Sequence, residues 1–160
     1  LCIRDSYMPA DDKYIIVQPA KKEVDWDPKK ALDVLEDVKL NMHVNDSRVY
    51  LTGLSMGGRG TFIIAAAMPD YFAALMPLSP HHDPFPYTIL AEDVSHLPIW
   101  MSHGDSDNTS SYEMAAEMAD ILEGLGAEIE FRTIVDGEHE GWFGIYIDPV
   151  AMGWVLSKSS

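Results

Sequence analysis

Short apolar runs alternate with longer helix-like stretches along most of this 160-residue chain. The short runs are rich in β-branched, aromatic and other apolar residues, and they occupy residues 14–18, 48–54, 74–78, 98–102 and 127–135. The longer stretches carry apolar or small residues at helical spacing, and they cover about 27–40, 56–68, 110–125 and 148–157. Strands that alternate with helices predict a parallel sheet flanked by helices. We therefore expect one α/β domain over residues 1–160, with about five strands and a half-exposed edge strand at 127–135.

Residues typical of helix ends support these boundaries. Asp27 and Pro28 are expected to be an N-cap followed by a proline in the first helical position. Ser110 or Ser111 is expected to cap the helix that follows, and Gly126 lies just beyond its predicted end. The helices are therefore delimited by the sequence itself.

The segment Gly53-Leu-Ser-Met-Gly57 follows a predicted strand and opens a predicted helix. A G-x-S-x-G sequence in that context is typical of a nucleophile elbow, a tight turn that holds a serine hydroxyl above a sheet. Ser55 is the expected nucleophile, and both glycines are expected to be required because side chains beside the serine would collide. Met56 begins the helix, so its N–H is the expected oxyanion donor. For the pentapeptide alone, the alternative is a glycine-rich turn with a solvated serine.

A serine nucleophile needs a histidine base and a carboxylate that orients this base. Asp105 and Asp107 both follow the fourth predicted strand, and His139 follows the fifth. The carboxyl ends of parallel strands lie at one edge of a sheet, so we expect these side chains near Ser55. The chain order of serine, aspartate and histidine is also that of α/β-hydrolases.

Other histidines near these loops have simpler interpretations. His103 opens a His-Gly turn and is expected to be a structural hydrogen-bonding group. The run His81-His82-Asp83 lacks the i, i+4 spacing of a helical zinc site, so we expect no metal there. The loop over residues 79–88 is expected instead to line the substrate pocket.

Four segments together resemble the α/β-hydrolase superfamily, and more closely its branch of feruloyl esterases, polyhydroxybutyrate-depolymerase-like esterases and "predicted peptidases". They are the elbow segment 46–62, the run Ala67-Met-Pro-Asp-Tyr-Phe-Ala-Ala and its continuation to Ser79, His103-Gly104-Asp105-Ser106-Asp107, and Gly137-Glu138-His139-Glu140-Gly141-Trp142. The resemblance covers about residues 14–157. It implies a serine hydrolase of the carboxylesterase type with Ser55 as nucleophile and His139 as base, and it selects Asp107 over Asp105 as the acid. It implies no metal and no organic cofactor.

The resemblance also guides expectations about the substrate. With no cap domain between the strands, the pocket is expected to be shallow and open, which favours short acyl chains on a small-molecule ester. Trp142, His81 and Phe85 are the expected substrate-binding residues, although packing would explain each of them equally well.

One departure from the family concerns the start of the fold. The family's oxyanion loop precedes the strand matched at 14–18, and Leu1-Cys-Ile-Arg-Asp-Ser-Tyr-Met-Pro9 contains no His-Gly. The first three strands are therefore expected to be missing, and strand 14–18 is expected to pair directly with strand 48–54. The second oxyanion donor is expected from Leu54 or a loop amide near 18–20. Because one donor can contribute about 10²–10³ in rate, we expect weak to moderate catalysis.

Composition and charge narrow the choice of partners. Eleven Lys and Arg against 26 Asp and Glu give a net charge of −15, which argues against nucleic acid and anionic membranes. The apolar area left by missing elements predicts a homo-oligomer, a dimer or larger. Cys2 is the single cysteine and gives no sign of an oxidising compartment, so we expect a cytoplasmic protein, with secretion left open for a truncated N-terminus.

Two other functions remain as alternatives to the esterase. The same triad could serve a peptidase or thioesterase, although amide cleavage demands more transition-state stabilisation. A catalytically silent hydrolase domain that acts in binding is the alternative from a different class, and the missing oxyanion loop is its motivation.

Overall fold

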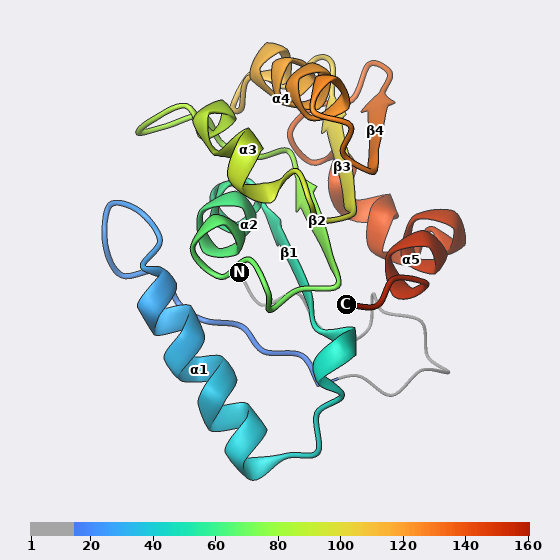
Figure 1. The fold of residues 1–160 in the computed structure, drawn as a ribbon. Helices are drawn as coiled ribbons and strands as arrows, with labels where there is room; N and C mark the ends of the chain where they lie inside the picture. Colours follow the sequence, from blue (N-terminus) through green and yellow to red (C-terminus); the bar gives the residue numbers. More distant parts are fainter. Residues whose placement is uncertain (1–14) are drawn as a thin grey trace.

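The computed structural model describes residues 15–160, except for the side chains of residues 141–143. Its centre is a parallel sheet whose strands lie side by side in chain order (Figure 1). These strands are β1 (Tyr50–Leu54), β2 (Ala74–Leu78), β3 (Ile99–Gly104) and β4 (Ile129–Ile134). All neighbouring pairs are parallel, so the carboxyl ends of the strands meet at one edge of the sheet.

Helices cover both faces of this sheet (Figure 1). The α-helices are α1 (Pro28–Asn41), α2 (Met56–Ala67), α3 (Ala91–Val94), α4 (Tyr112–Gly124) and α5 (Pro149–Leu156). Short 3₁₀ segments are η2 (Asp46–Arg48), η3 (Tyr87–Leu90) and η4 (Gly141–Ile147). The helices α1 to α4 pack on one face, whereas α5 and η4 cover the other. The expected α/β architecture of a parallel sheet flanked by helices is therefore confirmed, with four strands in the described residues where about five were expected.

Two apolar cores hold these layers together. The larger core joins Phe62 and Ile64 of α2, Leu75 and Ile99 of the sheet, and Met118 of α4 with their neighbours. A buried apolar side chain of this size stabilises the fold by about 1.5–3 kcal/mol relative to exposure. The smaller core lies under α5 and η4 and is built around Met76, Leu78, Trp100, Met152 and Val155. The terminal helix and η4 thus cover this second face.

The predicted helix caps occur at the residues that the sequence indicated. Asp27 accepts a hydrogen bond from Lys29 N, with Pro28 in the first turn of α1. Ser111, rather than Ser110, caps α4 by accepting a hydrogen bond from Met114 N at 3.1 Å. Such caps satisfy N–H groups that have no partner inside the helix.

The strand expected at 14–18 is not formed by the residues that the structure describes. Residues 15–22 have no regular secondary structure, and Ile15 and Ile16 are each almost half exposed. The expected pairing of this strand with β1 is therefore wrong, because β1 pairs only with β2 within residues 15–160. Tyr14 lies outside the described residues. A β-branched run favours an extended chain but becomes a strand only where a partner supplies the hydrogen bonds.

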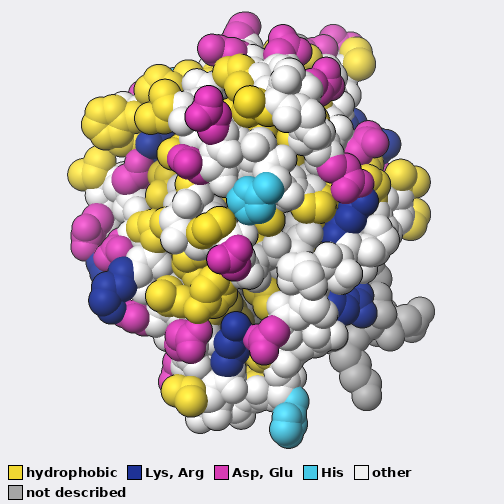
Figure 2. All heavy atoms as spheres, in the orientation of Figure 1, with side chains coloured by type: hydrophobic (Ala, Val, Ile, Leu, Met, Phe, Trp, Pro, Cys, Tyr) yellow, Lys and Arg dark blue, Asp and Glu magenta, His cyan; other side chains and the backbone are white. Residues whose placement is uncertain are grey.

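Acidic side chains outnumber basic ones in this chain. Figure 2 shows Asp and Glu dispersed over the visible face, with fewer Lys and Arg between them, in line with the net charge of −15. Over residues 15–160, no helix is both long enough and apolar enough to cross a membrane.

Candidate active site

Ser55 occupies a strained turn between β1 and α2. Its backbone has φ 55° and ψ −115°, a left-handed conformation that non-glycine residues rarely adopt. The turn is held by hydrogen bonds from Ser55 N to Leu78 O at 2.9 Å and from Arg59 N and His81 N to Ser55 O, both at 3.0 Å. Ser55 Oγ forms no hydrogen bond with the described residues. The geometry is that expected of a nucleophile elbow.

The glycines around Ser55 are needed for different reasons from those expected. A Cβ on Gly53 would lie 2.4 Å from the carbonyl carbon of Gly57, so the backbone itself excludes a side chain there. A Cβ on Gly57 would meet no atom within 4 Å, and the expectation that Gly57 avoids a collision is therefore wrong. Gly58 is crowded instead, with Leu78 O 2.7 Å from a built Cβ. The turn brings the backbone of residue 57 against Gly53, and the Gly57 side-chain direction points to open space.

Met56 is the first residue of α2, where backbone N–H groups lack partners inside the helix. Its carbonyl oxygen accepts a hydrogen bond from Trp26 Nε1 at 2.6 Å. The Trp26 indole also lies against Gly60, where a Cβ would come 2.6 Å from Nε1. The segment before α1 is thereby fixed on the first turns of α2, next to the expected oxyanion donor.

Asp107 and His139 are brought together by the carboxyl ends of β3 and β4. Asp107 Oδ2 lies 2.8 Å from His139 Nδ1, and the Asp107 side chain is fully buried. The other oxygen, Oδ1, accepts hydrogen bonds from Thr109 N at 2.8 Å and Ser110 N at 2.9 Å. An aspartate that bonds backbone N–H groups two and three residues ahead is a common turn arrangement, and it orients the carboxylate toward His139.

These contacts decide the charge of Asp107. Burial alone would raise the pKa of Asp107, but the hydrogen bonds from Ser110 N, His139 and Thr109 N outweigh it and hold the pKa below its usual value. Asp107 is therefore a carboxylate at neutral pH and can stabilise a protonated imidazole. Asp105, the other candidate acid, is exposed, and within residues 15–160 its side chain accepts a hydrogen bond from Ser106 Oγ at 3.4 Å.

His103 is a second imidazole beside the Asp107 carboxylate. It is fully buried, and its Nε2 is 3.1 Å from Asp107 Oδ2 and 3.2 Å from Ser110 O. Burial, more than any other cause, lowers the pKa of His103, so the ring is neutral at pH 7. The expectation of a structural hydrogen-bonding role agrees with this position.

The third candidate, Ser55, lies at the same edge of the sheet as these two groups. Leu54 is in register with Leu78, which is in register with Ser102, and Gly104 is in register with Ile134. His81 links the two parts of this edge: its N–H bonds Ser55 O, and its Nδ1 lies 3.2 Å from Ser110 Oγ. The loops that carry the three candidates thus meet through the loop after β2.

The segment that follows His139 is held against β1 by a buried tyrosine. Tyr146 of η4 is buried, and its hydroxyl lies 2.8 Å from Thr52 Oγ1, which in turn donates to Met76 O at 2.8 Å. Burial raises the pKa of Tyr146 to about 12, so its hydroxyl keeps its proton. This contact ties the segment after His139 to β1, the strand that leads into Ser55.

The expected substrate-binding residues have different surroundings. His81 is partly buried, and burial is the main reason that its pKa lies below the ordinary value. The Phe85 side chain is mostly exposed, and its carbonyl oxygen accepts a hydrogen bond from Arg59. The backbone of Trp142 belongs to η4, but its side chain lies outside the described residues. Their roles in binding stay predictions.

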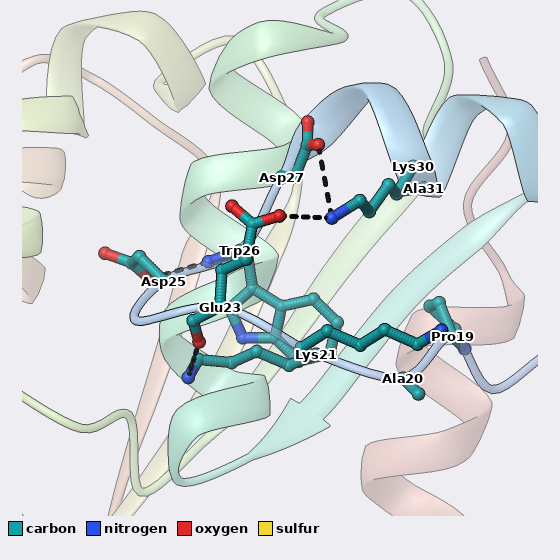
Figure 3. Close-up of a pocket in the computed structure, with 10 residues that line it drawn as sticks. Pro19, Ala20, Lys21, Glu23, Asp25, Trp26, Asp27, Lys30 and Ala31 are labelled. Atoms are coloured by element: carbon teal, nitrogen blue, oxygen red, sulfur yellow. Dashed lines mark hydrogen bonds and ion pairs between the residues drawn. The ribbon is translucent and has the colours of Figure 1, made fainter.

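A small pocket lies beside the elbow, between the segment at 19–27 and the start of α1 (Figure 3). Trp26 lies across it, and Lys30 at its rim forms ion pairs with Glu23 at 2.5 Å and Asp27 at 3.8 Å (Figure 3). All its lining residues fall within 19–31, so it is separate from the loops that carry Asp107 and His139. No group of three or more potential metal ligands was found among the described residues.

Comparison with known proteins identifies the family. Residues 18–133, more than two thirds of the chain, match the family described as "Putative esterase". The chain belongs to this esterase family. The expected resemblance to an esterase family is thereby confirmed.

Individual relatives match over shorter parts of their length. A poly(3-hydroxyalkanoate) depolymerase C of Paucimonas lemoignei is 41% identical over 46 residues, which are 29% of this chain and 11% of the depolymerase. Among solved structures, a thermostable esterase has a TM-score of 0.74 and 24% identity, over 81% of this chain and 36% of its own. An S-formylglutathione hydrolase of Staphylococcus aureus has a TM-score of 0.64 and 18% identity, over 80% of this chain and 59% of the hydrolase. These likenesses show the fold, and this chain spans about a third to three fifths of the length of these two solved structures.

Some residues of this region could not be found by reasoning from the sequence. The Arg59 guanidinium is almost fully buried, pairs with Asp25 at 2.6 Å and also donates to Phe85 O. Trp26, on the same segment as Asp25, contacts the elbow helix. Of these residues, Arg59 alone stands out in the sequence, because it is a charged residue within an otherwise small and apolar helix. Its partners cannot be read from the sequence.

Proposed function

We propose that this chain is a serine carboxylesterase that hydrolyses short-chain acyl esters through Ser55, His139 and Asp107. The observation that carries the proposal is the 2.8 Å contact between Asp107 Oδ2 and His139 Nδ1, at the sheet edge that also holds Ser55 in a strained turn. Family membership supports the reaction class. The fully buried, charged carboxylate supports the assignment of Asp107 rather than Asp105.

Each of the three residues has its own step in the proposed mechanism. The hydrogen bond from His139 Nδ1–H to Asp107 leaves Nε2 free to accept the proton of Ser55 Oγ as this oxygen attacks the ester carbonyl. The new Oγ–C bond gives a tetrahedral oxyanion, which the Met56 N–H stabilises. His139 then gives its proton to the departing alcohol as the C–O bond breaks, and an acyl-enzyme on Ser55 is left.

Water completes the cycle by the reverse sequence. His139 takes a proton from water, which attacks the acyl carbonyl, and then returns the proton to Ser55 Oγ as the acid departs. Asp107 stays ionised throughout and stabilises the imidazolium. A second oxyanion donor is proposed from Leu54 N–H or the amides near 18–20, because Trp26 holds that segment against the first turns of α2.

The proposed acyl preference rests on the expectation that the site is shallow and open. His81 and Phe85 are proposed to border the acyl group, since the His81 N–H is bonded to Ser55 O and the Arg59 side chain holds the Phe85 backbone. The proposed substrates are neutral small-molecule esters, because the acidic surface repels polyanions. A series of p-nitrophenyl esters of increasing acyl length should show falling kcat/KM beyond the short chains.

Hydrolysis of p-nitrophenyl acetate tests the proposal. We expect turnover by the wild-type chain, loss of turnover in Ser55→Ala, and unchanged turnover in Ser95→Ala, which removes a partly buried serine hydroxyl that donates to Glu92 O. Full activity in Ser55→Ala would overturn the mechanism. A matching anilide tested in parallel separates an esterase from a peptidase.

A further inference from the structure

Two histidine side chains lie within hydrogen-bond distance of the same oxygen of the Asp107 carboxylate. His139 Nδ1 lies 2.8 Å and His103 Nε2 lies 3.1 Å from the same atom, Asp107 Oδ2. The remaining oxygen accepts two backbone N–H groups, those of Thr109 and Ser110. The triad proposed above uses only His139, so the second histidine has no part in the esterase mechanism as described.

The contacts of His103 determine where its proton lies. Its Nε2 faces two acceptors, Asp107 Oδ2 and Ser110 O, and an imidazole nitrogen near two acceptors must carry the hydrogen. Its Nδ1 is buried and has no hydrogen-bond partner among the described residues, as a nitrogen without a proton would be. His103 is thus a neutral donor whose Nε2–H is shared between Ser110 O, with which it forms a hydrogen bond, and the Asp107 carboxylate beside it.

The surroundings of His103 keep this orientation fixed. The residue is the fifth of β3, is fully buried, and packs edge-to-face against the Tyr112 ring at 6.0 Å between centroids. The titratable groups that face it are Asp107 and Tyr112 and, farther away, His139 and Glu113. Asp107 is therefore the charged group in direct contact with the His103 ring.

We infer that His103 is a positioning residue of the proposed triad, which donates a second hydrogen bond to Asp107 Oδ2 and so fixes the carboxylate and moderates its pull on the His139 proton. The inference rests on the proposed function for its catalytic consequence, but not for the contact itself. A hydrogen bond to a charged group is among the stronger ones in proteins. With this donor removed, Asp107 would hold the proton on His139 more strongly.

Variants at position 103 separate this role from simple packing. In His103→Gln, the amide Nε2 can take the place of the ring Nε2 and donate to Asp107. In His103→Asn the amide is too short to reach, and His103→Leu has no donor at all. Tyr112→Phe is the matched control, because it removes a hydrogen bond to Thr133 from the same cluster without touching Asp107.

The first readout is a double-mutant cycle in urea unfolding at pH 7.5, which needs no enzymatic activity. We expect His103→Asn or His103→Leu to lower the folding equilibrium constant about tenfold in the wild-type background and much less in Asp107→Asn. Equal effects in both backgrounds would overturn the inference. His103→Gln should recover most of the loss, and a failure of Gln to do better than Asn would also count against the contact.

The second readout is the pH profile of kcat/KM for p-nitrophenyl acetate. His103→Asn should shift the acidic limb to higher pH, whereas His103→Gln and Tyr112→Phe should leave it in place. An unshifted limb in His103→Asn would contradict the proposed effect on His139. A wild-type chain without turnover, combined with clear coupling in unfolding, would overturn the esterase proposal and leave the His103–Asp107 contact standing.

Discussion

Asp107 is the residue on which the candidate site depends most. Its side chain is fully buried and receives backbone N–H groups on one oxygen and imidazole nitrogens on the other. These contacts are stronger for a carboxylate than for a neutral acid, and they hold the pKa of Asp107 below its usual value despite the burial. A depressed pKa in the folded state means that folding favours the ionised form.

The stability of the chain should therefore depend on the charge of Asp107. Because the folded-state pKa lies below the ordinary value of 3.8, the contribution is complete above about pH 4 to 5 and is lost as the pH falls through the folded-state value. We expect wild type to exceed Asp107→Asn by about 1–3 kcal/mol in unfolding free energy at pH 7. Urea titrations from pH 7 to 3 should show the difference shrinking only below about pH 4, and a constant difference would contradict the assignment.

The two elbow glycines give a second prediction at the residue scale. Gly53→Ala places a Cβ 2.4 Å from the backbone of Gly57, whereas Gly57→Ala meets nothing within 4 Å. Gly53→Ala should cost at least about 2–3 kcal/mol or prevent folding, and Gly57→Ala should be neutral or gain up to about 1 kcal/mol in α2. Urea unfolding of the pair checks this, and equal losses would show that the elbow has a different geometry.

At the scale of elements, a buried ion pair joins the elbow helix to the segment before α1. The Arg59 guanidinium of α2 contacts both Asp25 oxygens, with distances of 2.6–3.1 Å, and also the Phe85 carbonyl in the loop after β2. The ion pair thus links two segments that flank the start of α2. Without the Arg59 guanidinium, both segments would lose this contact with α2.

Removal of this ion pair should be costly. We expect Arg59→Met to lower the unfolding free energy by about 3–5 kcal/mol, because Asp25 and the Phe85 carbonyl lose their shared partner. Lys29→Met, which breaks an exposed pair with Asp33, should produce no measurable change. Urea unfolding of both variants makes the comparison, and a small effect of Arg59→Met would show that water replaces the guanidinium.

The order of elements was largely predictable from local sequence patterns. The helix that starts at Pro28 and the strands at β2 and β4 needed only hydrophobic spacing and capping residues. The strand expected at 14–18 failed because strand formation depends on a distant partner, which no local pattern reveals. The Asp107–His139 contact was predicted from strand order and resemblance, whereas the Arg59–Asp25 pair depends on packing between segments far apart in the chain.

At the scale of the whole molecule, the described residues leave both edge strands of the sheet, β1 and β4, with a single neighbour each, and several apolar side chains exposed. Within residues 15–160, β1 pairs only with β2. Val24, Leu40, Ile89 and Val135 are each at least 74% exposed. Open sheet edges and exposed apolar groups favour association with another chain.

These features support the expectation of a homo-oligomer. Sedimentation velocity at micromolar concentration should give a species of at least twice the 17.8 kDa monomer mass. Association through apolar contacts should persist at high salt, because screening weakens charge interactions far more than apolar ones. A clean monomer at these concentrations would contradict the expectation without affecting the assignment of the triad.

The most direct test of the central claim is covalent labelling with a fluorophosphonate, followed by mass spectrometry of the modified peptide. A Ser55 activated by His139 and Asp107 should react quickly and exclusively, and His139→Ala and Asp107→Asn should slow the reaction by orders of magnitude. Ser95→Ala should label as the wild type does. Rapid labelling of Ser55 that depends on both partners is the predicted result, and an unlabelled Ser55 in folded protein, or labelling indifferent to His139, would contradict the account.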